Sequence, residues 1–334
     1  LDLQSLYTSI IMSLNIRPET KIGKVYNWNL EEHIKKNISE YEVDVQGQIM
    51  KFSYDKFIEF MNRLKFTISS NGILYLNDRR GIIPEILDKW FNERIEYKNL
   101  MKKYTAEGDS EKADYYDRRQ HVQKIFLNSI YGVLGLPVFR FYDLDNAFAV
   151  TSTGQDVIKT SAKYLNNKYQ TQLKTNNDYC IYIDTDSVYF SAVPLINTDN
   201  DESKKQDTIS LAREHEAALN TFYNTMAKKL FFCDTHRFVI KGETIAGTGL
   251  WVAKKCYALL KIYDLETNKN INKIVTKGLG TVRSSFPEAF GKFMSTILEN
   301  ILNNLTKHDI DTEILRFYNS LTSLEGGPKT VGGD

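Results

Sequence analysis

Hydrophobic and polar positions repeat at two different periods along this chain, which predicts both helices and strands. Residues 53–64 (SYDKFIEFMNRL) carry apolar side chains at helical spacing, behind a serine suited to cap the first turn. Two short alternating runs then flank Asn71–Gly72, a pair typical of a β-hairpin turn. Residues 27–50 are polar without a clear period, so we expect them to be irregular.

Two long helical patterns follow, from Pro84 to about Tyr104 and from Ser110 to about Val133. Proline suits the first turn of a helix, and Gly108 interrupts the pattern between the two. Because the connection is short, we expect an antiparallel helical hairpin.

The rest of the chain mixes both periods without a regular alternation. The expected elements are a helix at 151–174 capped by Thr or Ser, a β-rich run at 179–192, a solvated loop at 197–207, a helix at 210–230, strands at 237–247 and 254–265, a helix at 286–305 and a non-periodic tail at 325–334. This order favours the α+β class.

Composition excludes only a few classes of protein and of binding site. The 334 residues suffice for two or three domains, and the net charge of +1 requires any basic surface to be local. The three cysteines are scattered, which argues against a disulfide framework and a cysteine-based zinc site. No apolar run approaches the roughly 18 residues of a membrane span, so we expect no membrane partner.

The sharpest chemical signal is YIDTDSVY at residues 182–189. On an extended chain, Asp184 and Asp186 would face the same side. Their apolar and aromatic neighbours predict burial, where two carboxylates repel each other unless a cation neutralises them. Oxygen ligands indicate Mg²⁺ or Mn²⁺. For an isolated Asp-x-Asp, an ordinary turn would be the better interpretation.

A third carboxylate, Asp2, lies at the start of LDLQSLYTSII, ahead of an aromatic, helix-forming run. Three acids would complete a cage for two cations, roughly 3.5–4 Å apart, that clamp the oxygens of a phosphoryl displacement. Ser5, Leu6 and Tyr7 would lie where a strand turns into a helix, and N–H groups there bind phosphate. Core packing is the alternative for Tyr7. Because Asp2 stands one residue from the start of the sequence, we expect no preceding strand to fix its position.

The helical hairpin carries cations at helical spacing. Arg94 and Lys98 share one face, while Lys124, Asn128 and Tyr131 share a face of the second helix. Cations converging from two helices suit a triphosphate. An ordinary solvated face is the alternative for any one of these charges.

Taken together, these motifs resemble a known family. DLQSLYTSII, KIFLNSIYG and YIDTDS resemble motifs A, B and C of family B (alpha-type) DNA polymerases, in that order. KKCYAL near residue 254 is similar to the family's KKRY element, and NSIYGVLG with FRFYDLDNA looks most like the tailed-phage branch. The resemblance extends from residue 2 to about 287, and four motifs in order are highly specific.

The resemblance implies a fold and a set of domains. It implies a palm, which is an antiparallel sheet backed by helices that carries all three acids, with an inserted helical fingers hairpin. The expected domains are palm at 1–83, fingers at 84–132, palm again at 133–285 and the start of a thumb at 286–334.

It also implies roles for the residues that match. Asp2, Asp184 and Asp186 match the catalytic acids, and Asp2, Asp186 and the Leu3 carbonyl match the metal ligands. Positions that bind the incoming nucleotide are Ser5, Leu6, Tyr7, Arg94, Lys98, Lys124 and Asn128, with Tyr7 as the gate that excludes a 2′-OH. Contacts to the base pair and primer are Tyr131, Gly132, Lys254, Lys255 and Tyr257. Glu243, as a further palm acid, and Thr185 are additional candidates.

Three positions depart from the family pattern. Thr8 replaces a proline, and we expect it to start a helix nonetheless. Ile183 replaces a glycine and cannot adopt a positive φ cheaply, so the turn there must be ordinary β or shifted. Cys256 replaces an arginine, which removes one cationic contact to the primer.

The implied activity is template-directed addition of dNTPs to a primer 3′-OH with two Mg²⁺ ions, or Mn²⁺ in their place. Expected partners are primer–template DNA, dNTPs, a sliding clamp, and the exonuclease, N-terminal and thumb regions that the family has and this sequence lacks. The implied location is the cytoplasm, that of the host for a viral protein.

Two further expectations concern the sequence as a fragment. It begins at Leu1 within motif A, as an incomplete sequence, a split piece or a processed product would. We expect the chain by itself to bind DNA weakly, and to be weakly active or inactive.

The alternative function is a non-catalytic, polymerase-derived subunit that binds nucleic acid. Its signature would be loss of the carboxylates, and all three are present. Another palm enzyme, such as a reverse transcriptase or primase, is disfavoured by the order of the motifs and by the second helix of the hairpin.

Overall fold

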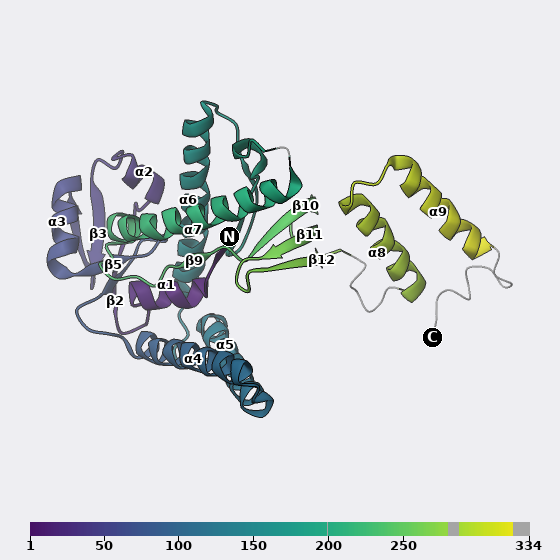
Figure 1. Cartoon of the computed structure of the whole chain (residues 1–334). Coiled ribbons are helices and arrows are strands. Elements are labelled where there is room, and N and C mark those ends of the chain that lie inside the picture. Colours follow the sequence, from purple (N-terminus) through teal and green to yellow (C-terminus); the bar gives the residue numbers. More distant parts are fainter. Residues whose placement is uncertain (199, 280–286, 323–334) are drawn as a thin grey trace. The chain divides into compact units, whose positions relative to one another are not determined.

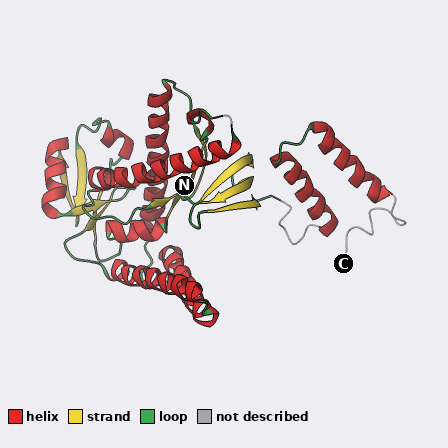
Figure 2. Ribbon diagram, viewed as in Figure 1, coloured by secondary structure: helices red, strands yellow, loops and turns green. Residues whose placement is uncertain are grey.

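The computed structural model describes residues 1–198, 200–279 and 287–322 (Figure 1). Helices and antiparallel strands occur throughout this part of the chain (Figure 2), which agrees with the α+β class. The chain divides into two compact units, residues 1–197 with 211–241, and residues 198–210 with 242–334. Each unit is described by itself.

The first unit contains two antiparallel sheets and their covering helices. Its elements are β1 (Asp2–Leu3), α1 (Leu6–Leu14), β2 (Lys21–Val25), α2 (Leu30–Ile34), β3 (Tyr41–Val45), β4 (Gln48–Phe52), α3 (Tyr54–Leu64), β5 (Phe66–Ile68), β6 (Ile73–Leu76), α4 (Ile82–Glu107), α5 (Ser110–Leu134), α6 (Leu144–Leu173), β7 (Cys180–Asp184), β8 (Ser187–Phe190), the 3₁₀ turn η1 (Val193–Leu195), most of α7 (Asp201–Phe231) and β9 (Ile240–Lys241). The strand orders are β4-β3-β2-β6-β5 and β7-β8-β1-β9.

Helix α1 lies at the centre of the larger core. All of its side chains except the half-buried Tyr7 are buried, including the hydroxyl-bearing Thr8, Ser9 and Ser13. It packs against α4, α5 and α6, so it connects the four-stranded sheet with the long helices. A second core lies between α3 and the five-stranded sheet, where Tyr41 stacks on Phe57 with ring centroids 4.1 Å apart.

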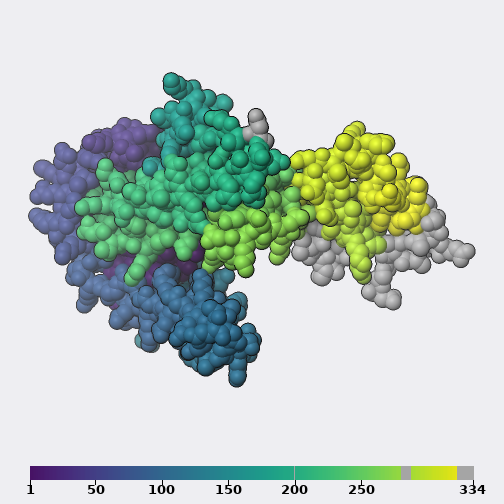
Figure 3. Space-filling view, in the orientation of Figure 1, coloured from purple at the N-terminus to yellow at the C-terminus, as the bar shows by residue number. Residues whose placement is uncertain are grey.

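Helices α4 and α5 form the predicted antiparallel hairpin, which projects from the rest of the first unit (Figure 3). Gly108 ends α4 with a φ of 77°, a conformation that glycine adopts without strain. The rings of Trp90 and Phe126 lie 5.3 Å apart near the root, and those of Tyr104 and Tyr116 stack at 5.6 Å further out.

The second unit contains an antiparallel sheet and two helices. Its elements are the start of α7, β10 (Thr244–Ala253), β11 (Cys256–Asp264), β12 (Lys269–Lys277), α8 (Glu288–Leu302) and α9 (Lys307–Thr322). Leu298 and Leu302 of α8 pack on Ala258 of β11, which joins helix and sheet in one small core. The predicted tail at 325–334 and the start of the helix at 286 lie outside the described residues.

Several local predictions are confirmed. Helix α3 follows Ser53, although the serine side chain makes no capping hydrogen bond. The hairpin around Asn71–Gly72 forms between β5 and β6, with Gly72 at a φ of 81°. The predicted strands at 237–247 and 254–265 correspond to β9 with β10 and to β11.

Three local predictions are wrong. Residues 27–50 are not irregular, because α2, β3 and the start of β4 lie there, with Tyr41 and Val43 fully buried. The expected loop at 197–207 is helical from Asp201, since salt bridges such as Lys205–Glu202 stabilise a polar helix. Helix α6 begins before residue 151, and its cap is Asp143, whose carboxylate accepts from the Asn146 N–H.

Candidate active site

The two acids of the DTDS motif lie at a tight turn between β7 and β8, Asp184 at the end of β7 and Asp186 in the turn itself. Asp184 ends β7 and pairs with Ser187, the first residue of β8, so Thr185 and Asp186 form the loop between them. The interpretation as one extended segment is therefore wrong, because the chain reverses at this turn. Asp184 is buried at 4% exposure, whereas Asp186 is half-buried.

The replacement of glycine by Ile183 causes no conflict in this turn. Ile183 lies within β7, and the positive φ falls on Thr185 at 55°. Of the two alternatives that the sequence left open for a β-branched residue at position 183, an ordinary β turn or a shifted one, the structure has the shifted turn. A threonine with positive φ is itself strained, and such strain gathers at functional sites.

Strand β1 places Asp2 between two other strands. Asp2 lies opposite Ser187 of β8 on one side and Lys241 of β9 on the other. The Ser187 hydroxyl donates to the Asp2 carboxylate at 2.6 Å, and the Leu3 N–H donates to the Asp186 carbonyl at 2.8 Å. Pairing with β8 and β9 thus fixes the position of Asp2 from both sides.

The three acids therefore lie on neighbouring strands, at the β7–β8 turn and in β1. Within residues 1–198, 200–279 and 287–322, however, no three His, Cys, Asp or Glu side chains gather closely enough to hold a metal ion. The donors themselves fit magnesium, since carboxylates and a backbone carbonyl are hard oxygen ligands. The sheet brings the donors near one another, and the complete cage stays a prediction.

A helix starts directly after Asp2, as the sequence predicted. Ser5 precedes α1 with φ and ψ of 49°, and its side chain does not cap the helix. The first turn of any helix has N–H groups without intrahelical acceptors, which is the arrangement that binds phosphate. Thr8 lies in this turn, and its hydroxyl donates to the buried Leu127 carbonyl of α5 at 2.9 Å. A threonine thus serves in place of the family's proline.

Tyr7 contacts the second helix of the hairpin. Its ring lies 4.4 Å from that of Tyr131, tilted by 36°, and the side chain is half-buried. Residues 124 positions apart in sequence therefore meet at the start of α1, which neither motif predicts separately.

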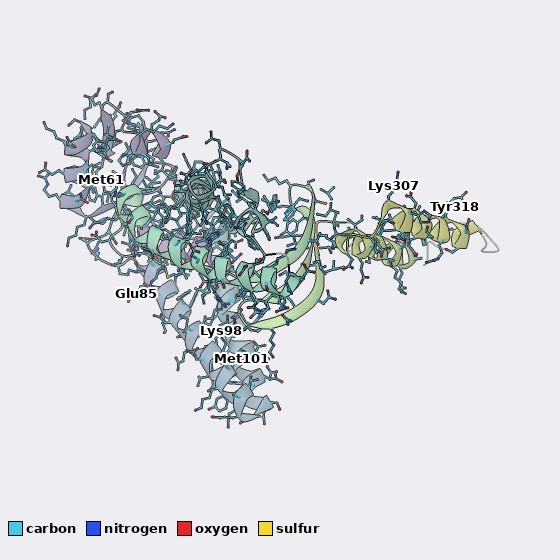
Figure 4. All side chains as sticks on the ribbon, turned by 45° about the horizontal axis from the view of Figure 1, so that its top comes forward. Met61, Glu85, Lys98, Met101, Lys307 and Tyr318 are labelled. Carbon is cyan, nitrogen blue, oxygen red and sulfur yellow. The ribbon has the colours of Figure 1, made fainter. Side chains whose placement is uncertain are left out.

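The cationic positions lie on facing helices of the hairpin. Gln123 of α5 donates to Glu93 of α4, and Arg94 and Lys124 are the next residues along each helix. Arg94 and Lys98 are half-buried, whereas Lys124 and Asn128 are exposed. Figure 4 shows Lys98 well along α4 from its root. Their convergence on one ligand stays a prediction.

Gly132 follows Tyr131 in α5, and the other remaining candidates belong to the second unit. Lys254 and Lys255 form the exposed turn between β10 and β11, with Lys255 at a φ of 58°. Tyr257 is buried in β11 under the Lys277 ammonium, which lies 5.9 Å from its ring. Glu243 is exposed just before β10, and its carbonyl accepts from the Leu265 N–H.

The sequence interpretation missed two residues that hold the site strands. Ser187 binds Asp2, and its place directly after the second acid was the available signal. Asn220 of α7 holds β9 by accepting from the Ile240 N–H and donating to its carbonyl, both at 2.9 Å. No local pattern around residue 220 indicates this role, because its partner is distant in sequence.

The acids of β1 and of the β7–β8 turn lie beside the N-terminus of α1, and the α4–α5 hairpin, which carries the candidate cations, packs on that helix. This arrangement defines a candidate site for phosphoryl chemistry. The chain belongs to DNA polymerase family B, whose model matches residues 1–326.

Its relatives include viral and archaeal polymerases. The chain is 28% identical to the DNA-directed DNA polymerase of Escherichia phage RB69 and 27% identical to that of Enterobacteria phage T4, covering 90% of this chain and 38% of each relative. It is 26% identical to a DNA polymerase of Choristoneura biennis entomopoxvirus, over 94% of this chain and 33% of the relative. The chain thus spans about a third of the length of these relatives. Among the described helices, none combines the length and apolarity needed to cross a membrane.

Proposed function

We propose that this chain carries the palm and fingers of a family B DNA polymerase and adds dNTPs to a primer 3′-OH under template direction. The observation that carries the proposal is the position of Asp2, which is paired beside the DTDS turn and followed directly by a helix that contacts the hairpin. In this proposal residues 1–83 and 133–285 form the palm, 84–132 the fingers, and 286–334 begin a thumb.

Asp2, Asp186 and the Leu3 carbonyl would hold two Mg²⁺ ions, or Mn²⁺, with Asp184 as the buried companion acid. When bound, the ions would supply Lewis acidity toward the primer hydroxyl and the departing pyrophosphate. The Ser187 hydroxyl orients Asp2 by its 2.6 Å hydrogen bond. The oxygen donors and their places on adjacent strands support this assignment.

The start of α1 would bind the nucleotide. The Ser5 and Leu6 amides would cradle the triphosphate, and Tyr7 would exclude a ribose 2′-OH. A gate needs a rigid side chain, and the contact of Tyr7 with Tyr131 supports that role. The hairpin side chains proposed to grip the phosphates are Arg94, Lys98, Lys124 and Asn128.

Tyr131 and Gly132 would line the nascent base pair. Lys254, Lys255 and Tyr257 would contact the primer strand, and Glu243 and Thr185 remain further candidates. The proposed partners are primer–template DNA and dNTPs, and beyond them a sliding clamp and the other domains of the polymerase. For a viral polymerase, the proposed location is the host cytoplasm.

Primer extension tests the proposal. The purified chain, in molar excess over a labelled primer–template with Mg²⁺ and dNTPs, should extend the primer. Asp186→Asn should abolish extension, whereas Asp178→Asn, an exposed acid just before β7, should not. Equal extension by Asp186→Asn and the unchanged chain would overturn the assignment. DNA binding without extension by any form would favour the non-catalytic subunit.

A second test concerns the gate. Tyr7→Ala should raise incorporation of ribonucleotides relative to deoxynucleotides, because the ring would no longer fill the space beside the 2′ carbon. Tyr131→Leu removes the supporting ring and should raise the same ratio to a smaller extent. An unchanged ratio in Tyr7→Ala would show that another residue is the gate.

A further inference from the structure

A cluster of three charged side chains lies at the root of the α4–α5 hairpin. Asp88, in the second turn of α4, pairs with Arg80 from the loop before α4 and with Arg237 from the segment after α7. The Arg237 Nη2 lies 2.9 Å from the Asp88 Oδ1, and the Asp88 side chain is only 21% exposed. One carboxylate therefore joins three segments, and we call these residues the root cluster.

The root cluster is bound to the C-terminal half of α1. The Arg80 guanidinium donates to the Met12 carbonyl at 2.6 Å, and the Arg237 N–H donates to the Ser13 hydroxyl at 2.8 Å. Asn15, which ends α1, accepts from the Gly81 N–H at 2.8 Å, directly before α4 begins. The start of the hairpin is thus fixed to the end of α1.

The other helix of the hairpin is fixed to the opposite end of α1. Thr8 binds the Leu127 carbonyl of α5, and Tyr7 contacts Tyr131. Because α1 has nine residues, these two attachments lie about 10 Å apart along its axis. The hairpin is therefore attached to α1 at two separate points.

We propose that Asp88 is a positioning residue that holds the α4–α5 hairpin at its angle to α1, and thereby sets how closely the hairpin's cationic face approaches the start of α1. This inference rests on the proposed nucleotide site there. A half-buried carboxylate between two guanidinium groups resists displacement more strongly than an exposed ion pair does. Figure 4 shows Glu85 near this root, and Lys98 and Met101 further along α4, so a small tilt at the root moves Lys98 further than it moves Glu85.

Hydrogen exchange measured by mass spectrometry tests the attachment without any need for activity. Asp88→Asn should speed exchange of the amides in residues 82–92 by about tenfold or more, because a charged contact at the root is lost. Arg237→Ala should act on the same amides, and the double variant should exceed the larger single effect only slightly. Glu107→Gln is the matched control, since Glu107 lies on the same helix in an exposed pair with Lys103. Equal exchange in Asp88→Asn and the control would overturn the proposal.

Nucleotide kinetics test the positioning role. Asp88→Asn should raise the KM for dNTP about tenfold with little change in kcat, and Asp88→Glu should recover part of the loss. A purely structural role would instead lower the active fraction, which reduces kcat and leaves KM unchanged, and that result would refute positioning. If Asp88→Asn does not fold, Arg237→Ala replaces it, because that side chain is 44% exposed. The proposed function fails if Asp186→Asn leaves extension unchanged, whereas the exchange experiment decides whether the root cluster holds the hairpin even when the isolated chain extends no primer.

Discussion

Lowering the pH should loosen the contact between α6 and α7 through a single buried histidine. His215 of α7 is 3% exposed, and its Nε2 lies 3.1 Å from the Tyr169 hydroxyl of α6. Tyr169 in turn contacts Phe190 of β8, with ring centroids 5.6 Å apart. The histidine therefore supports the helix that lies behind one of the site strands.

The pKa of His215 is lowered to about 4, mainly by burial and also by the nearby Lys168 ammonium, against the opposing Glu214 carboxylate. The ordinary histidine pKa is about 6.5, so the unfolded chain binds a proton more readily than the folded protein. The stabilising contribution is complete above pH 6.5 and is lost as the pH falls toward 4. At pH 5 the loss amounts to about 2 kcal/mol, or a fall of roughly 4–8 °C in Tm.

His215→Gln provides the comparison, because glutamine can keep a hydrogen bond to Tyr169 and has no proton to gain. Thermal unfolding followed by circular dichroism at pH 7 and pH 5 should show that the unchanged chain loses about 2 kcal/mol more than the variant. Burial also lowers the pKa of His33 and His236, and the variant retains both, so the difference isolates His215. Equal losses in the two proteins would refute a buried neutral histidine.

Three further substitutions test the packing around α1 and α6 by urea unfolding. Gly81→Ala should cost about 1–3 kcal/mol, because a Cβ would approach the Arg17 Cδ to 2.2 Å; an unchanged midpoint would show that Arg17 moves aside freely. Thr8→Val should cost about 1 kcal/mol through loss of the Leu127 hydrogen bond, whereas a gain in stability would contradict that bond. Lys21→Met leaves two carboxylates at the start of α6 without their shared ammonium and should cost about 1 kcal/mol; a cost that does not shrink in high salt would contradict an electrostatic origin.

Much of the local structure could be predicted from the sequence. Apolar spacing located α3, α4 and α5, and Gly108 and Gly72 marked the turns, because these signals act between residues only a few positions apart. The short strands β3 and β4 were not predicted. Tyr41, Val43 and Val45 of β3 do alternate with acidic residues, but the run is only five residues long and lies in a polar stretch. The helical start of α7 was not predicted either, because ion pairs between polar side chains stabilise it and it shows no apolar face.

The candidate site likewise has features that could be predicted from the sequence and features that could not. Its residue types could be found from the motifs, as the match to DNA polymerase family B over residues 1–326 confirms for the family as a whole. The sequence also predicted the strand-to-helix junction after Asp2, and a shifted turn was one of the two alternatives that it left open at Ile183. It left open whether Asp184 and Asp186 share one face of an extended strand or lie in a turn, because a turn and a metal-binding pair use the same residue types.

The sequence by itself thus indicated the family to which this chain belongs and where most of the described helices lie. Only the tertiary structure decided that Asp2 is held between β8 and β9, that Tyr7 contacts Tyr131, and that Asp88 joins Arg80 with Arg237. Local patterns report interactions within one or two turns of a chain. Most of these contacts join residues more than a hundred positions apart, and they depend on how the sheets and helices pack around α1.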